Sequence, residues 1–163
     1  FEDYAATQGP IQLFAPHSPS NPLPARLIIS GGSMSEDWAI LTPLSNTVIG
    51  AWIPLSPAPA QRGTRVIAAG FAPTTDSGET ERPPEAPSSR ALMYDPDCLV
   101  TSATSRPARS DCFARKGASG GAILRRTASG SVRVVGVISA GDGESVSYFH
   151  PTDSLASRIR SLR

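Results

Sequence analysis

The sequence predicts an all-β chain that ends in one short helix. Short apolar runs recur along its length and are separated by turns, a spacing typical of strands. The 163 residues include 16 prolines and 14 glycines, which favour turns and short strands over long helices. Helical spacing of apolar side chains occurs only near the end, at Leu155, Ile159 and Leu162. A chain of this length can bury a sizeable core.

Eight apolar runs are expected to form strands. In order, they are residues 11–14, 26–29, 65–71, 90–94, 98–101, 122–125, 132–138 and 145–149, and residues 38–41 form a further compact apolar run. The polar turn at 128–131 joins two of them into a hairpin. The helix is expected over 151–162, with Thr152 or Asp153 as its cap. Residues 73–90 break the pattern, because four prolines, four acidic residues and almost no apolar side chains favour an exposed, mobile loop.

The composition argues against several classes of function. The formal net charge is +1, so no bulk electrostatic attraction to nucleic acid or to an acidic membrane is expected. No apolar stretch approaches the ~20 residues that a membrane-spanning helix needs. The cysteines and histidines lack the spacing of a metal site, and we predict no metal and no cofactor. No secretion signal opens the chain and Phe1 is not an initiator methionine, so we expect a segment upstream of it.

Ser119 stands in the pattern with the clearest chemical meaning. The run 116–121 reads Lys-Gly-Ala-Ser-Gly-Gly, and an apolar strand at 122–125 follows it. Acyl transfer needs a nucleophile at a sharp turn with backbone N–H groups near its oxygen, and glycines permit such a turn. An ordinary Gly/Ser-rich hairpin loop is the competing interpretation. The Gly-x-Ser-x-Gly elbow of α/β-hydrolases precedes a helix, whereas here a strand is expected.

Four segments in sequence order resemble those of trypsin-like, chymotrypsin-fold serine proteases of the bacterial type. They are Asp-Trp-Ala-Ile-Leu at 37–41, the strand 63–71, Gly-Ala-Ser-Gly-Gly at 117–121 and Val-Gly-Val-Ile-Ser-Ala-Gly at 135–141. In that family they correspond to the segment of the triad aspartate, the first strand of the second barrel, the nucleophile loop and a strand that lines the substrate. The resemblance covers the chain from about Glu36 to its end.

The resemblance implies two six-stranded antiparallel barrels of the chymotrypsin type and a C-terminal helix. The first barrel is expected to be incomplete in this chain. Residues 1–60 would hold the remainder of the first barrel, and residues 61–163 the second barrel and the helix.

The resemblance also assigns roles to single residues. Ser119 would be the nucleophile, Asp37 would orient the histidine that acts as general base, and the N–H groups of Gly117 and Ser119 would form the oxyanion hole. The competing interpretation of Asp37 is a surface acid or a cap at a strand end. Ala118 stands where many family members have an aspartate that pairs with a new N-terminus, so that activation switch is not expected.

Five residues are expected to line the substrate pocket by the same resemblance. They are Phe113, Ser139, Ala140, Gly141 and Val146. Phe113 occupies the pocket floor, where an acid would favour arginine or lysine, so small or apolar substrate side chains are expected. Ile138 stands where glutamate-specific relatives have a histidine, which argues against that specificity.

Cys98 and Cys112 are either two buried free thiols or a disulfide. Bacterial relatives often have a cysteine pair in this region, so the resemblance favours the disulfide. A disulfide is typical of a secreted or periplasmic protein.

The general base is missing from the expected position. His17 lies only 20 residues before Asp37 and lacks the family's surrounding motif, and His150 lies where the family enters its final helix, far from the triad. Both histidines are interpreted as surface or structural residues. We therefore expect an N-terminal segment or second chain to supply the histidine, with a polypeptide as substrate. The alternative is a catalytically inactive pseudoprotease that binds proteins.

Overall fold

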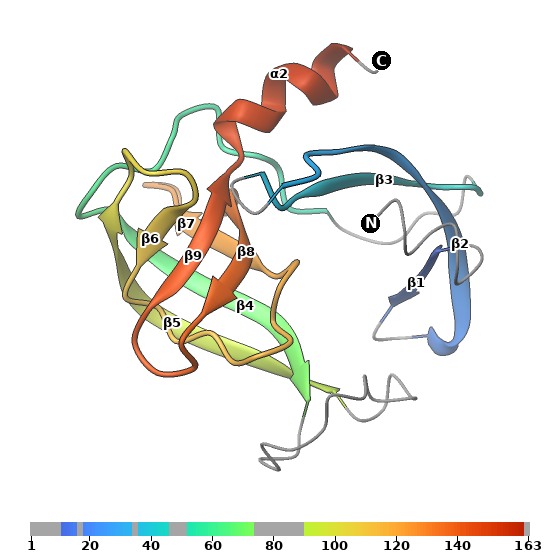
Figure 1. The fold of residues 1–163 in the computed structure, drawn as a ribbon, viewed down its shortest axis with the longest axis horizontal. Helices are drawn as coiled ribbons and strands as arrows, with labels where there is room; N and C mark the ends of the chain where they lie inside the picture. The colour runs from blue at the N-terminus through green and yellow to red at the C-terminus, as the bar shows by residue number, and fades with distance from the viewer. Residues whose placement is uncertain (1–10, 16–17, 34–35, 46–51, 74–89, 162–163) are drawn as a thin grey trace.

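The structure is a computed structural model that describes residues 11–15, 18–33, 36–45, 52–73 and 90–161. These residues form a three-stranded sheet, a closed barrel and the helix α2 (Figure 1). His17 and most of the segment expected to be an exposed loop, 74–89, lie outside the described residues. The predicted all-β class with a C-terminal helix is confirmed.

The first sheet is an antiparallel meander of β1 (Ile11–Ala15), β2 (Ser18–Ser30) and β3 (Ala39–Pro43). β2 is far longer than the expected run at 26–29. Its prolines all precede Ala25, where pairing with β3 begins, so they lie in the part of β2 that pairs only with β1. Proline has no N–H to donate to a neighbouring strand, and it is tolerated where one side of a strand lacks a paired neighbour.

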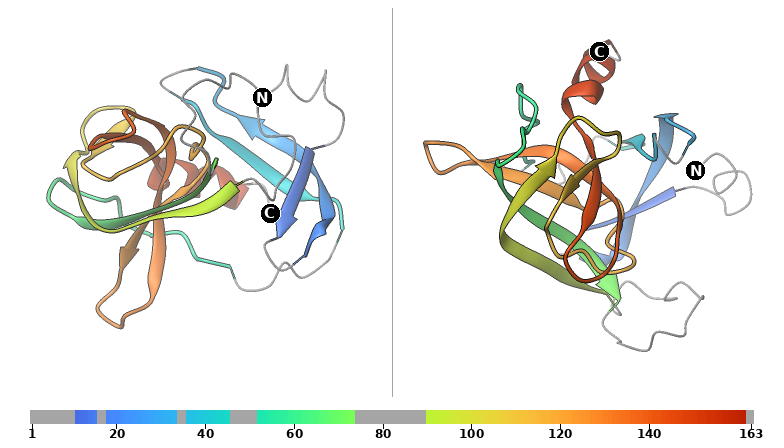
Figure 2. Two further views of the ribbon diagram at one scale, coloured as in Figure 1. Left: turned by 90° about the horizontal axis from the view of Figure 1, so that it is seen from below. Right: turned by 60° about the vertical axis from the view of Figure 1, so that its left-hand side comes forward.

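The second sheet closes on itself into an antiparallel six-stranded barrel (Figure 2). Its strands are β4 (Arg65–Pro73), β5 (Arg90–Ser102), β6 (Ala108–Ser110), β7 (Ala122–Arg126), β8 (Val132–Gly141) and β9 (Ser147–Pro151), paired in the order β4-β5-β6-β9-β8-β7. Closure leaves no free strand edge in the barrel. The second of the two expected barrels is therefore confirmed, while the first is represented by three strands.

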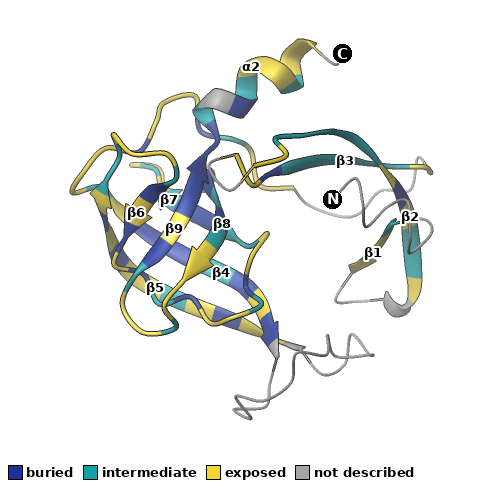
Figure 3. Ribbon diagram, in the orientation of Figure 1, coloured by how far each residue is buried: buried dark blue, intermediate teal, exposed yellow. Residues whose placement is uncertain are grey.

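The barrel encloses the hydrophobic core. Its largest fully buried apolar side chains are Phe149, Ile123, Val66, Val100 and Val135, which come from five of the six strands. Figure 3 shows buried positions alternating with exposed ones along β6 and the first three residues of β9. This alternation is the period-2 pattern of a strand with one face on a core.

The helix α2 (Asp153–Ser161) follows β9 directly and its Leu155 is buried. Thr152 stands at the cap position, since its carbonyl oxygen accepts the amide of Ala156 at 2.9 Å. Its hydroxyl does not cap the helix, because it donates to the carbonyl of Val134 at 3.1 Å. No helix among the described residues is long and apolar enough to cross a membrane.

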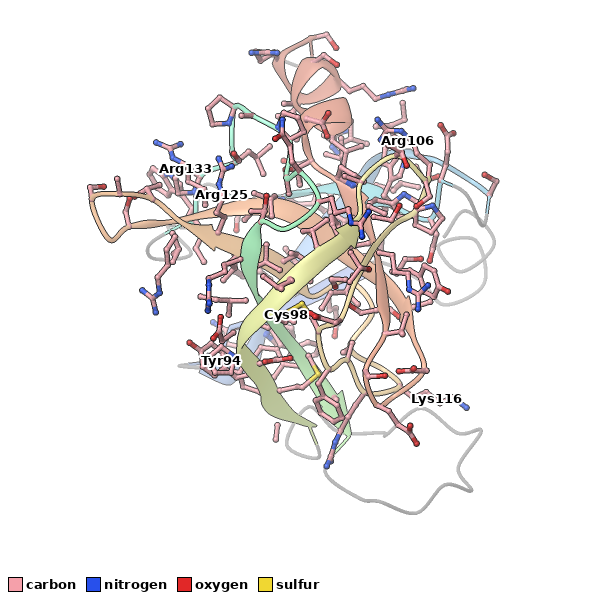
Figure 4. All side chains as sticks on the ribbon, turned by 90° about the vertical axis from the view of Figure 1, so that its left-hand side faces the viewer. Tyr94, Cys98, Arg106, Lys116, Arg125 and Arg133 are labelled. Carbon is pink, nitrogen blue, oxygen red and sulfur yellow. A yellow bond between two sulfur atoms is a disulfide. The ribbon has the colours of Figure 1, made fainter. Side chains whose placement is uncertain are left out.

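Cys98 and Cys112 form a disulfide, as the resemblance implied (Figure 4). Both are buried, and the bond ties β5 to the segment that leads into the Ser119 loop. A disulfide is compatible with an extracellular or periplasmic location.

Replacing both Cys98 and Cys112 with alanine should lower the free energy of unfolding by roughly 2–4 kcal/mol, because the cross-link restricts the unfolded chain. Urea denaturation of the variant and the oxidised wild type measures this difference. Two reactive thiols in the unreduced, denatured wild type would contradict the pairing.

Candidate active site

Ser119 lies on an exposed turn between β6 and β7. Gly117 and Gly120 on either side adopt positive φ angles of 91° and 86°, which L-amino acids with side chains rarely adopt. The glycines therefore allow the tight turn that presents the Ser119 side chain to solvent. The sequence motif had predicted such a turn.

The backbone of this turn leaves two amides unused. The amides of Ala118, Gly120 and Gly121 each donate to a backbone carbonyl, at 3.0, 2.8 and 2.9 Å. Within the described part of the chain, the amides of Gly117 and Ser119 donate to no acceptor. Both are close in sequence to the Ser119 hydroxyl, so they are available to an anionic oxygen next to it.

A chain of two hydrogen bonds runs from Ser119 to Asp37 through Ser139. The Ser119 hydroxyl donates to the carbonyl oxygen of Ser139 at 2.8 Å. The Ser139 hydroxyl donates to Oδ2 of Asp37, also at 2.8 Å, across 102 residues of sequence. The first sheet and the barrel thus place the predicted carboxylate and the predicted nucleophile on either side of one residue of β8.

His150 contacts the backbone of Asp37, not its carboxylate. Nε2 of His150 accepts a hydrogen bond from the Asp37 amide at 3.1 Å. The His150 side chain, which belongs to β9, is buried. Burial lowers the pKa of His150, and the negative charge of Asp37 opposes that shift only partly. The expectation that His150 lies far from Asp37 is wrong, since the two residues are joined by this hydrogen bond. The bond to the amide engages the lone pair that a general base for Ser119 would need.

Four of the five predicted pocket residues lie at one end of β8. Ser139, Ala140 and Gly141 end that strand, and the amide of Asp142 donates to the carbonyl of Val146 at 3.0 Å, which brings Val146 beside Gly141. Phe113 packs half-buried against the barrel core.

The Asp142 carboxylate stabilises this turn, since its Oδ1 accepts the amides of three residues. They are Glu144, Ser145 and Val146, at 2.8–2.9 Å. These hydrogen bonds hold the pKa of Asp142 below its usual value, led by the one from Glu144. Sequence reasoning did not find Asp142, although an aspartate followed by Gly-Glu-Ser is a turn signal.

No protein-family model matches the chain, and no curated protein matches it. The structure resembles the crystal structure of the MamO protease domain from Magnetospirillum magneticum in its apo form, with a TM-score of 0.54. The two sequences are 18% identical over 90% of this chain and 72% of that chain. At this identity the likeness shows the fold alone. Together with the closed six-stranded barrel, it supports a chymotrypsin-like fold.

Proposed function

We propose that the chain is the nucleophile-bearing part of a serine endopeptidase, with Ser119 as nucleophile and Asp37 as the carboxylate of a Ser-His-Asp triad. The observation that carries the proposal is the hydrogen-bonded chain Ser119–Ser139–Asp37. It joins an exposed hydroxyl on a glycine turn to a carboxylate of the segment that precedes β3.

The proposed chemistry follows from this arrangement. The Ser119 oxygen attacks the peptide carbonyl carbon while the histidine takes the hydroxyl proton, and the carbonyl oxygen becomes an anion that the amides of Gly117 and Ser119 stabilise. The C–N bond then breaks, the histidine gives its proton to the leaving amine, and water hydrolyses the acyl-serine by the reverse sequence. Asp37 holds the imidazole in the productive tautomer throughout.

The histidine is proposed to come from a segment that packs on the first sheet. In contrast to the barrel, this sheet has no second layer among the described residues, and every residue of β3 is only half-buried although the strand begins Ala-Ile-Leu. Two large apolar side chains of this sheet and its end are exposed, Phe14 of β1 and Leu44 directly after β3. Such a surface suits an apolar β-segment, which is what the missing half of a first barrel would provide.

The proposed substrate is a polypeptide with a small or apolar side chain at the cleaved bond. Phe113 supplies an apolar ring, and no acid stands among the five predicted pocket residues to attract arginine or lysine. A division near residue 60 is proposed to separate the first-barrel part from the second. A secreted or periplasmic location is proposed from the disulfide.

Hydrolysis of an unfolded polypeptide by the complete protein tests this function. We expect peptide release by the wild type and none above background by Ser119→Ala. Ser105→Ala, which removes an exposed hydroxyl on the β5–β6 connection, is the matched control and should retain wild-type activity. Equal activity of Ser119→Ala and the wild type would reject Ser119 as nucleophile.

The second candidate is a pseudoprotease that binds proteins without cleaving them. The favouring observation is that the Ser119 hydroxyl donates to a backbone carbonyl, and no histidine of the described residues contacts it. A complete protein that binds polypeptides but shows no Ser119-dependent hydrolysis would support this candidate.

A further inference from the structure

The segment 36–38 is joined to the C-terminal half of the chain by three different elements. From β8, the Ser139 hydroxyl bonds the Asp37 carboxylate. From β9, His150 bonds the Asp37 amide. From α2, the Arg158 guanidinium lies 5.4 Å from the centre of the Trp38 ring, and that ring is buried. In Figure 1, the top of β9 and the base of α2 lie beside the end of the first sheet where this segment runs.

The two polar contacts fix different parts of the same residue. Ser139 bonds the Asp37 carboxylate. His150, which lies 113 positions from Asp37 in the sequence, bonds the Asp37 backbone amide. A side chain is oriented accurately only when its backbone is also fixed, because any movement of the main chain displaces the carboxylate with it. The backbone contact therefore contributes to the orientation of Asp37 together with the contact at its carboxylate. The adjacent main chain has two further hydrogen bonds, from the Gly31 amide to the Trp38 carbonyl and from the Trp38 amide to the Glu36 carbonyl, each at 3.0 Å.

We propose that His150 is a positioning residue for Asp37, whose neutral imidazole holds the Asp37 backbone against the barrel and whose protonation releases the Asp37–Trp38 segment. The effect of His150 on catalysis rests on the proposed function, whereas the release of the Asp37–Trp38 segment on protonation does not. Nε2 accepts the amide only when it carries no hydrogen, so protonation replaces an acceptor with a second N–H facing the Asp37 N–H. The side chain is 4% exposed, so water is poorly placed to compensate the lost bond.

The charges around His150 do not cancel this effect. Asp37 and Glu36 on the facing segment favour the protonated imidazole, and Arg106 on the β5–β6 connection disfavours it (Figure 4). Val137, its partner on β8, adds no charge. Burial is the largest influence and lowers the pKa of His150, so the folded state binds its proton less readily than the unfolded state does. Stability is then complete above the ordinary histidine pKa of about 6.5 and falls as the pH drops below it.

Trp38 reports on this contact without any need for enzymatic activity. The protein has two tryptophans, and Trp52 is 80% exposed whereas Trp38 is 8% exposed. In a Trp52→Phe background, acrylamide quenching of the complete protein monitors Trp38 alone. The Trp38→Phe variant, which retains Trp52, gives the quenching expected of an exposed indole.

Quenching of Trp38 should be low at about pH 7.5 and should rise toward the Trp52 value as the pH falls below about 6.5, because the pKa of His150 is lowered in the folded state. In His150→Gln, whose side-chain oxygen accepts a hydrogen bond and does not titrate, Trp38 should stay protected across this range. In His150→Phe, which keeps the ring but removes the acceptor, Trp38 should already be exposed at the upper pH. The same acid transition in His150→Gln as in the wild type, or full protection in His150→Phe, would overturn the proposal. Should His150→Phe fail to fold, His150→Gln alone decides.

Kinetics of the complete protein separates this inference from the proposed function. His150→Phe should lower kcat while KM stays near the wild-type value, because the substrate contacts are intact and only the carboxylate is displaced. His150→Gln should restore kcat and remove one ionisation from the pH profile. Loss of Trp38 protection in a protein without hydrolytic activity would sustain the His150 contact and reject the protease, whereas an unchanged kcat in His150→Phe of an active enzyme would reject the positioning role alone.

Discussion

Asp37→Asn should slow acylation of Ser119 by about 10⁴-fold, because an amide in place of the carboxylate leaves the base histidine in the wrong tautomer. The geometry of the substitution is conservative, so the fold should be unaffected. The Ser139 hydroxyl retains an acceptor oxygen on the new side chain. The rate is measured as inactivation of the complete protein by a fluorophosphonate, which reacts with the same hydroxyl as the substrate.

The matched control for this substitution is Asp97→Asn. Asp97 is an exposed carboxylate that pairs with Arg65 at 2.6 Å, on the β5 side of the barrel. An ion pair at such an exposed site contributes at most about 1 kcal/mol to stability, so the control should inactivate at the wild-type rate. A wild-type rate in Asp37→Asn would show that Asp37 is a surface acid and not part of a triad.

Phe149→Ala should lower the free energy of unfolding by about 3–5 kcal/mol. Phe149 is fully buried and faces Ala108 of β6 on one side and Ile138 of β8 on the other. Truncation leaves a cavity at the centre of the barrel, and the closed sheet cannot collapse to fill it. Denaturant unfolding followed by circular dichroism measures the loss.

The neighbouring Tyr148→Ala provides the comparison, since Tyr148 points outward and is 38% exposed. It should cost far less, within about 1 kcal/mol of the wild type. Similar losses in the two variants would contradict the description of Phe149 as a core residue and with it the closed barrel.

The sequence predicted most of the barrel because its strands are apolar and bounded by turns. β4, β7 and β8 begin at or next to the predicted residues, since each carries a run of aliphatic side chains. β6 was missed because Ala-Arg-Ser is too short and too polar to look like a strand, and it exists only through pairing with β5 and β9. β5 was divided into two because Asp95-Pro96-Asp97 resembles a turn, although the structure carries the strand through it.

The candidate site divides in a similar way. The motif around Ser119 is local, so the sequence alone indicated the turn, and the order of motifs singled out Asp37. The hydrogen bond between His150 and the Asp37 amide joins residues 113 positions apart. No sequence motif near either residue indicates it, because it depends only on how the fold brings β9 and the Asp37 segment together. Ser139 was predicted as part of a pocket wall, while its hydrogen bonds to both Ser119 and Asp37 emerged only from the fold.

The most direct test of the account is the position of a fluorophosphonate adduct on the complete protein, mapped by tryptic digestion and mass spectrometry. We expect one modified serine, Ser119, because its hydroxyl is exposed on a glycine turn beside two amides that have no acceptor among the described residues and can hold the phosphonyl oxygen. Ser119→Ala should then carry no adduct. An adduct on a different serine, or no adduct on a protein that contains a histidine reaching Asp37 and Ser119, would contradict the assignment of Ser119 as the nucleophile.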